Sequence, residues 1–268
     1  MNAMRKTMMA FGLALVLMAC RAEKSMETSG SDGLTTVYEL RDFTGVHAGG
    51  AVHVQFTQGE NYSVEVDEST DPDLVTKVEK RGSTLFISTE QKKKGATAWK
   101  GDSPLVRITA PRMESIELNG ASTLQASKLK GEQLHLDVSG ASKAEAGLLE
   151  YGRVEAKCTG ASKVTASIKA EDISLDCSGA SKLTLNAEGK TMKATNSGAS
   201  KCDLTFVGGD VDFRNSGAGK VDLKVVDCKE LKASNSGASK FVISGNADKT
   251  TIDASGVAKI DTSRLNQY

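Results

Sequence analysis

The sequence predicts an all-β protein built as a parallel β-helix, a solenoid in which the short strands of successive coils stack on one another. Two observations support this prediction: the motif SGASK recurs with small variations, and apolar residues alternate with polar ones on both sides of it. Because successive motif glycines lie 19 or 20 residues apart, the repeat sets the length of one coil. These glycines are Gly120, Gly140, Gly160, Gly179, Gly198, Gly217, Gly237 and Gly256.

Alternating side chains predict a strand on each side of every motif glycine. The positions six and four residues before the glycine are mostly apolar, as in Leu134 and Leu136, and so are those four and six residues after it, as in Leu183 and Leu185. A period of two is typical of a strand with one buried face. Since one coil cannot bury that face alone, we expect about eight regular coils over residues 113–264, stacked about 4.8 Å apart. Each coil should hold two or three short strands.

Residues 36–112 are less regular but also predict β-structure. Alternating runs such as AVHVQF, STLFIST and LVRITA lie between residues that favour turns. We expect this segment to form the irregular first coils and cap of the same domain, 36–264, because terminal repeats are commonly atypical. A separate small β-domain is the alternative. Residues 73–80 are expected to form a single helical turn or a loop.

The first 35 residues predict export and attachment to a membrane. The apolar run TMMAFGLALVLMA follows Arg5 and Lys6, is too short to span a bilayer, and indicates a signal peptide over residues 1–19. It ends in Leu-Met-Ala-Cys, which resembles a lipobox, so we expect Cys20 to carry a lipid anchor. An ordinary signal peptide followed by a chance cysteine is the alternative. Residues 20–35 predict a flexible tether, and we expect the protein at the outer membrane, on its periplasmic face or the cell surface.

The composition and motifs argue against several classes of function. Thirty-four basic residues balance 34 acidic ones, so nucleic-acid binding is not expected. Only 4% of residues are aromatic, which argues against both carbohydrate and single-stranded nucleic-acid platforms, because these usually use stacking rings. The chain has no Gly-x-Ser-x-Gly, phosphate-loop or His-Glu-x-x-His motif. We therefore expect no enzyme activity, metal or cofactor. A polysaccharide lyase with clustered carboxylates, such as Asp203 with Asp222, is a less favoured alternative, since a unique site should interrupt the repeat.

A lysine stands three residues after the motif glycine in seven consecutive coils. In register, their ammonium groups would lie about 5 Å apart and repel one another. One interpretation is a basic stripe that binds a polyanion, such as an acidic glycan or lipopolysaccharide phosphate. We favour the other, a solvated face with interleaved carboxylates such as Glu145 that protects the sheet from sideways aggregation. The lysines are Lys143, Lys163, Lys182, Lys201, Lys220, Lys240 and Lys259.

The position two residues before the glycine faces the interior and carries asparagine or cysteine in five coils. Asn196, Asn215 and Asn235 follow one another there, which predicts a structural ladder of side-chain amides. Cys158 and Cys177 occupy the same position in the two preceding coils, so they should stack. Their spacing would permit a disulfide, although burial as free thiols is the favoured alternative. No Cys-x-x-Cys motif is present, so a zinc site is not expected.

Several stretches carry a resemblance to a known family. FTGVHAGGAVHVQFTQGENYSVEVD, VEKRGSTLFIST and VRITAPRMESIELNGAST, followed by the SGASK ladder, resemble the putative auto-transporter adhesin, head GIN domain, of Bacteroidetes envelope proteins. The resemblance runs from Val37 to Ser263 and implies a right-handed parallel β-helix, with adhesion suggested by the family's name. We expect a non-enzymatic, lipid-anchored envelope protein that presents its β-helix to a protein or glycan. A structural or self-associating envelope component is the alternative.

Overall fold

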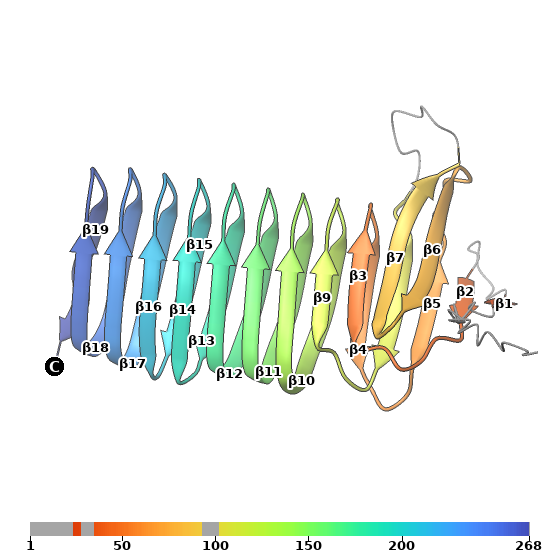
Figure 1. Ribbon diagram of the computed structural model, residues 1–268, viewed down its shortest axis with the longest axis horizontal. Helices are drawn as coiled ribbons and strands as arrows, with labels where there is room; N and C mark the ends of the chain where they lie inside the picture. The colour runs from red at the N-terminus through yellow and green to blue at the C-terminus, as the bar shows by residue number, and fades with distance from the viewer. Residues whose placement is uncertain (1–23, 28–34, 93–101, 268) are drawn as a thin grey trace, which may run out of the picture.

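In a computed structural model, the chain forms a parallel β-solenoid, a rod of stacked coils with an antiparallel cap at its N-terminal end (Figure 1). The structure describes residues 24–27, 35–92 and 102–267. This part of the chain contains no helix, and therefore none long and apolar enough to cross a membrane. The predicted signal peptide, Cys20 and most of the predicted tether lie outside the described residues, although 24–27 form a short strand within the tether segment.

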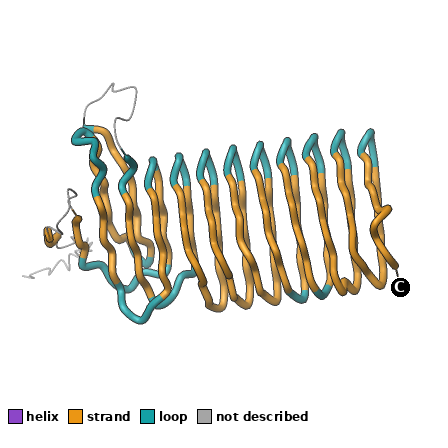
Figure 2. Tube along the Cα trace, turned by 180° about the vertical axis from the view of Figure 1, so that it is seen from behind, coloured by secondary structure: helices purple, strands orange, loops and turns teal. Residues whose placement is uncertain are grey.

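Each regular coil turns at a tight corner at one edge of the rod and at a wider bend at the other (Figure 2). At five of the bends the strand continues without a break, so the leaving strand of one coil and the entering strand of the next form one element. The entering strand precedes the corner and the leaving strand follows it. The entering strands β14 and β16 pair in parallel with each other, as do the leaving strands β13 and β15. The strands of the regular coils are β9 (Ser115–Leu118), β10 (Thr123–Val138), β11 (Lys143–Cys158), β12 (Lys163–Cys177), β13 (Lys182–Glu188), β14 (Thr191–Asn196), β15 (Lys201–Val207), β16 (Asp210–Asn215), β17 (Lys220–Asn235), β18 (Lys240–Ala254) and β19 (Lys259–Gln267).

Glycine fixes the corner for two physical reasons. Gly140 has a φ of +71°, and a Cβ atom there would lie 2.6 Å from the carbonyl oxygen of Gly120 in the neighbouring coil. The amide of Ala141 donates a hydrogen bond of 2.7 Å to that same carbonyl. Equivalent bonds link successive corners along the rod, so the corners hold the coils in register.

Stacked apolar side chains fill the interior of the rod. Val164, Leu183, Cys202, Val221 and Phe241 lie opposite one another in successive leaving strands, and none is more than 2% exposed. This confirms the prediction that coils of 19 or 20 residues bury a continuous core by stacking in parallel.

The coil next to Gly120 comes from a distant part of the sequence. Strands β3 and β4 form a coil with its corner at Gly50, whose carbonyl accepts a hydrogen bond of 2.6 Å from the Ala121 amide. This coil pairs in parallel with β9 and β10 on one side, and with β7 and β8 on the other. It therefore lies between two coils that both follow it along the chain. The four strands are β3 (Gly45–Gly49), β4 (His53–Gln58), β7 (Thr84–Gln91) and β8 (Leu105–Ala110).

Antiparallel strands complete the N-terminal end of the rod. β5 pairs with β2 and β8, β6 with β7, and β1 with β2. The expectation of a helical turn or loop at residues 73–80 is wrong, because this segment forms β6, with Leu74, Thr76 and Val78 buried and Lys77 exposed. After β6 the chain turns at Gly82, and β7 then runs antiparallel beside β6. The cap strands are β1 (Lys24–Glu27), β2 (Thr35–Tyr38), β5 (Ser63–Asp67) and β6 (Leu74–Arg81).

Candidate ligand-binding face

The seven repeated lysines stand opposite one another along the leaving strands. Each pairs in register with the next, from Lys143 to Lys259. Since paired strands lie about 4.8 Å apart, the ladder places one ammonium group on each rung beside the corner. Thr123 and then His53 continue the row toward the cap.

Carboxylates compensate three of these lysines. Each of the three carboxylates stands two residues further along the same strand, and the ion pairs are partly exposed. They join Lys143 to Glu145 at 2.5 Å, Lys201 to Asp203 at 3.4 Å and Lys220 to Asp222 at 2.8 Å. Hydrogen bonding from Lys143 lowers the pKa of Glu145. Among the described residues, no ion pair is made by Lys163, Lys182, Lys240 and Lys259.

The leaving face consists of the outward positions three, five and seven residues after the corner, from the Gly50 coil to the last. It holds nine cationic side chains against four carboxylates, an excess of five positive charges. Beyond the ladder, the cations are Lys224 and Arg264, which the sequence prediction did not include. Aligning the repeats finds Lys224. Arg264 escapes this alignment because the register shifts between Val242 and Ser244. The carboxylates are Glu145, Asp203, Asp222 and Asp261.

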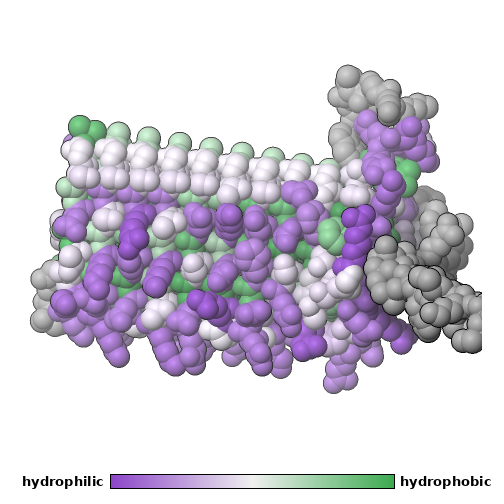
Figure 3. All heavy atoms as spheres, in the orientation of Figure 1, coloured by the Kyte–Doolittle hydropathy of each residue, from purple (hydrophilic) through white to green (hydrophobic). Residues whose placement is uncertain are grey.

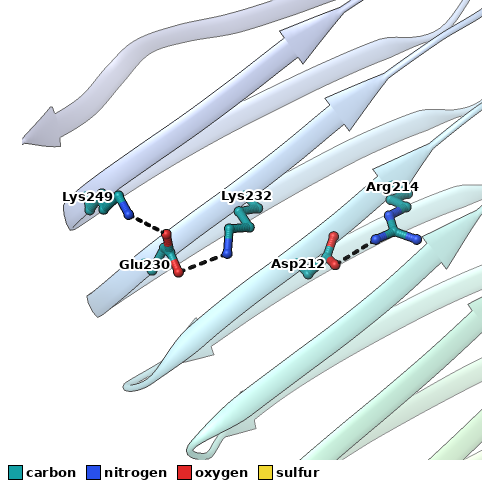
Figure 4. Close-up of polar contacts among 5 residues, drawn as sticks. All are labelled: Asp212, Arg214, Glu230, Lys232 and Lys249. Carbon is teal, nitrogen blue, oxygen red and sulfur yellow. Dashed lines mark hydrogen bonds and ion pairs between the residues drawn. The ribbon is translucent and has the colours of Figure 1, made fainter.

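The entering face, which consists of the outward positions five and three residues before the corner, has the opposite balance. Over the same coils it carries four cations and six carboxylates. Two of its cations are paired, Arg214 with Asp212 at 3.0 Å and Lys232 with Glu230 of the adjoining bend at 3.0 Å (Figure 4), whereas Lys157 and Lys193 make no ion pair among the described residues. Glu230 also contacts Lys249 of the next coil at 2.8 Å. The positive excess is therefore a property of one face of the rod.

Two shallow hollows lie on the leaving face beside the lysine ladder. The first, of about 450 Å³, is lined by Thr184, Asn186, Asp203, Thr205 and Asp222 among others. The second, of about 520 Å³, lies nearer the cap and is lined by residues that include Gln125, Ser127 and Thr165. Hydroxyl, amide and carboxylate groups of this kind donate and accept hydrogen bonds. Such groups can hydrogen-bond the hydroxyls of a ligand that lies in either hollow.

The corners form a different kind of surface along one edge of the rod. Figure 3 shows them as a pale ridge of small, uncharged side chains. Ala141 and Ala161 are exposed on this ridge, whereas Ser142 and Ser162 turn inward and are buried. The ridge thus separates the two charged faces at this edge.

The asparagine ladder lies inside the rod. Asn196 Nδ2 donates a hydrogen bond of 2.7 Å to Asn215 Oδ1, and Asn215 Nδ2 donates one of 2.8 Å to Asn235 Oδ1. All three side chains are at most 2% exposed. The asparagine side chains therefore contact groups of the core and offer no surface to a ligand.

The cysteines are also interior. Cys158 lies opposite Cys177 in adjacent strands, and both are buried free thiols, as are Cys202 and Cys228. Hydrogen bonding with Cys177 and burial raise the pKa of Cys158, which keeps it in the unreactive thiol form. No group of three or more His, Cys, Asp or Glu residues in the described chain is placed to hold a metal ion.

The acidic pair considered for lyase chemistry belongs to the repeat. Asp203 lies opposite Asp222 on the adjacent rung, and each forms an ion pair with the lysine of its own coil. A rod of equivalent coils, with side chains repeated along both faces, defines a β-solenoid that offers an extended surface in place of a single enclosed site.

The comparison with protein families agrees with this class. The chain belongs to the family described as putative auto-transporter adhesin, head GIN domain, whose model matches residues 42–205 and 190–267. This confirms the resemblance found in the sequence. The comparison with curated proteins gives no match.

Solved structures of Bacteroidetes proteins share the fold. A putative adhesin from Bacteroides fragilis is 16% identical with a TM-score of 0.63, covering 87% of this chain and 97% of its own. A putative adhesin from Parabacteroides distasonis is 14% identical with a TM-score of 0.64, covering 86% and 98%. A putative lipid binding protein from the same species is 15% identical with a TM-score of 0.60, covering 87% and 97%. At these identities the likeness is one of fold.

Proposed function

We propose that this protein is a non-enzymatic, lipid-anchored adhesin or binding scaffold of the cell envelope, and that the leaving face contacts its partner. The observation that carries the proposal is the in-register lysine ladder, in which four of the seven lysines make no ion pair among the described residues. Rungs about 4.8 Å apart lie within the Debye length of about 8 Å at physiological salt. The lysines therefore reinforce one another's positive potential, which an anionic partner would neutralise.

The residues beside the ladder favour binding over a purely solubilising role. A face that served only to keep the sheet in solution would be stabilised by a carboxylate beside every lysine. Thr165, Thr184 and Val242 instead stand at that position, next to lysines that make no described ion pair. Membership of an adhesin family and the uniformity of the coils also support a binding function over catalysis.

Exposure on intact cells tests the adhesin function. Protease added to intact cells should digest the rod if it faces the medium. A rod that is protected until the outer membrane is opened would overturn the adhesin proposal.

The lipid anchor is tested separately by Cys20→Ala. We expect the wild-type protein in the membrane fraction and the variant in the soluble envelope fraction, because the acyl chains supply the attachment. A control substitution at Ser25, after the cleavage site, should leave the protein in the membrane fraction. A Cys20→Ala variant that stays with the membrane would show that the anchor is elsewhere.

A further inference from the structure

We propose that the partner of the leaving face is a linear acidic polysaccharide that lies along the rod axis with about one sugar on each rung. This inference rests on the proposed function and names the chemical class of its ligand. Its first support is the geometry of the ladder, in which seven lysines repeat about every 4.8 Å in one straight row. An extended glycan advances by a similar distance per sugar ring, so its carboxylates stay in register with the ladder, and those on one side of a two-fold chain meet every second ammonium group.

The rows beside the ladder supply the second support. Thr165 and Thr184 adjoin lysines that have no described ion pair, and Asn186 and Thr205 line the hollow one position further out. These groups can donate and accept hydrogen bonds with sugar hydroxyls. Asp203 lies in the same hollow, where its carboxylate can accept a hydrogen bond from a hydroxyl while Lys201 stays nearby. The face therefore combines charge recognition with hydrogen-bonding groups on each rung.

Other linear polyanions match the ladder less well. The phosphates of one B-DNA strand repeat about every 3.4 Å, so they lose register with the lysines within a few rungs. An acidic peptide in extended form places same-side carboxylates about 6.6 Å apart, with the same result. The one aromatic ring that lines the described hollows, Phe56, is 3% exposed, so a ligand on this face is held by charge and hydrogen bonds and not by ring stacking, whether its rings are bases or sugars.

Oligogalacturonates of two to ten sugars are the probe, titrated calorimetrically into the purified mature full-length chain. Binding should tighten with each added sugar up to about the length of the ladder and then level off, and it should weaken as salt is raised. Methyl-esterified oligomers of the same lengths, which lack the charge, should bind weakly. An affinity that does not change beyond the disaccharide, or that survives esterification, would overturn the axial polysaccharide proposal.

A matched pair of variants locates the site. Lys163→Gln, Lys182→Gln and Lys240→Gln together remove three ladder lysines without breaking a described ion pair. Lys157→Gln, Lys193→Gln and Lys229→Gln make the same change of net charge at exposed positions outside the leaving face. We expect roughly tenfold weaker binding from the first set and less than about twofold from the second, given the modest worth of each exposed charge pair. Equal effects of the two sets would overturn the proposed site.

The same variants separate this inference from the proposed function. A single-stranded oligonucleotide and poly-glutamate serve as competing polyanions. If either binds more tightly than the longest oligogalacturonate and still depends on the ladder lysines, the ligand class is wrong and the binding face stands. If no polyanion distinguishes the ladder variant from its control, the leaving face itself is wrong as the site of binding.

Discussion

Truncating Asn215 should destabilise the rod by more than the size of its side chain suggests. Asn215 is the middle member of the buried ladder, where it accepts a hydrogen bond from Asn196 and donates one to Asn235. In Asn215→Ala, the Asn196 amide loses its partner inside the core. Asn235 Oδ1 is affected less, because it also accepts a hydrogen bond from the Ser239 hydroxyl.

The expected loss of stability in Asn215→Ala follows from these contacts. An unsatisfied buried donor costs about 1–3 kcal/mol, and the space left by the missing carboxamide adds roughly 1 kcal/mol. We therefore expect Asn215→Ala to lower the free energy of unfolding by about 2–4 kcal/mol. Replacing all three asparagines by valine, the residue at the equivalent Val138, should cost less than three separate Asn→Val changes added together. Removing both partners of a hydrogen bond leaves no orphaned group, and Ser200 and Ser239 keep their bonds to backbone carbonyls.

Urea unfolding followed by circular dichroism measures both effects as midpoint shifts at constant slope. A cost below about 0.5 kcal/mol for Asn215→Ala, which is the range of an ordinary surface change, would refute the argument. So would a triple-valine variant as unstable as the sum of its three single variants, because the ladder would then not act as a coupled network.

Three further predictions concern the corner, a buried thiol and an ion pair. Gly140→Ala should destabilise the protein more than Gly82→Ala in thermal unfolding, because a Cβ at Gly140 lies 2.6 Å from a backbone oxygen whereas one at Gly82 meets nothing within 4 Å. At Gly82 the left-handed backbone conformation alone accounts for a loss of about 1–2 kcal/mol. Equal losses of stability for the two variants would contradict the close approach of the backbones at the corner. Burial raises the pKa of Cys228 to about 11. The neutral thiol therefore contributes its full stabilisation below the pKa of cysteine in the unfolded chain, about 8.5, and this contribution is lost as the pH rises toward 11. At pH 8 the four buried thiols should react with a disulfide reagent only on unfolding, and immediate labelling of the native protein would be the contrary result. The hydrogen bond from Arg107 lowers the pKa of Asp67, so this pair stabilises the cap above about pH 3.9 and loses that effect as the pH falls through the lowered pKa. Arg107→Leu should cost about 0.5–1 kcal/mol at pH 7 and flatten the acid side of the stability curve, and an unchanged acid side would contradict the assignment.

The regular coils could be predicted because each one meets the same constraints. A glycine is required wherever the backbone of one corner contacts the next, and apolar residues are required wherever a strand faces the core. Equal spacing then predicts which residues stand opposite one another, as with Lys163 and Lys182. The Gly50 coil escaped prediction because 70 residues separate Gly50 from Gly120. Its neighbours are set by where the intervening chain returns, which local alternation does not reveal.

The candidate face could be predicted only in part. The carboxylate two residues after a lysine correctly locates the ion pairs of Lys143, Lys201 and Lys220. The same spacing does not give an ion pair at Lys259, because Asp261 instead accepts a hydrogen bond from the Ser263 hydroxyl at 2.7 Å. The register shift between β18 and β19 lies beside this residue. The hollows depend on how neighbouring side chains fill the face, which no single repeat shows.

The position of the Gly50 coil has a consequence for the order in which the rod assembles. Placing the Gly140 coil on the Gly120 coil closes a loop of 20 residues, whereas placing the Gly120 coil on the Gly50 coil closes one of 70. The longer closure costs about 1 kcal/mol more in chain entropy, so we expect the regular coils to form first and the junction at Gly50 to follow. As the chain emerges from its N-terminus, one side of the Gly50 coil therefore stays unpaired until β9 and β10 have been made.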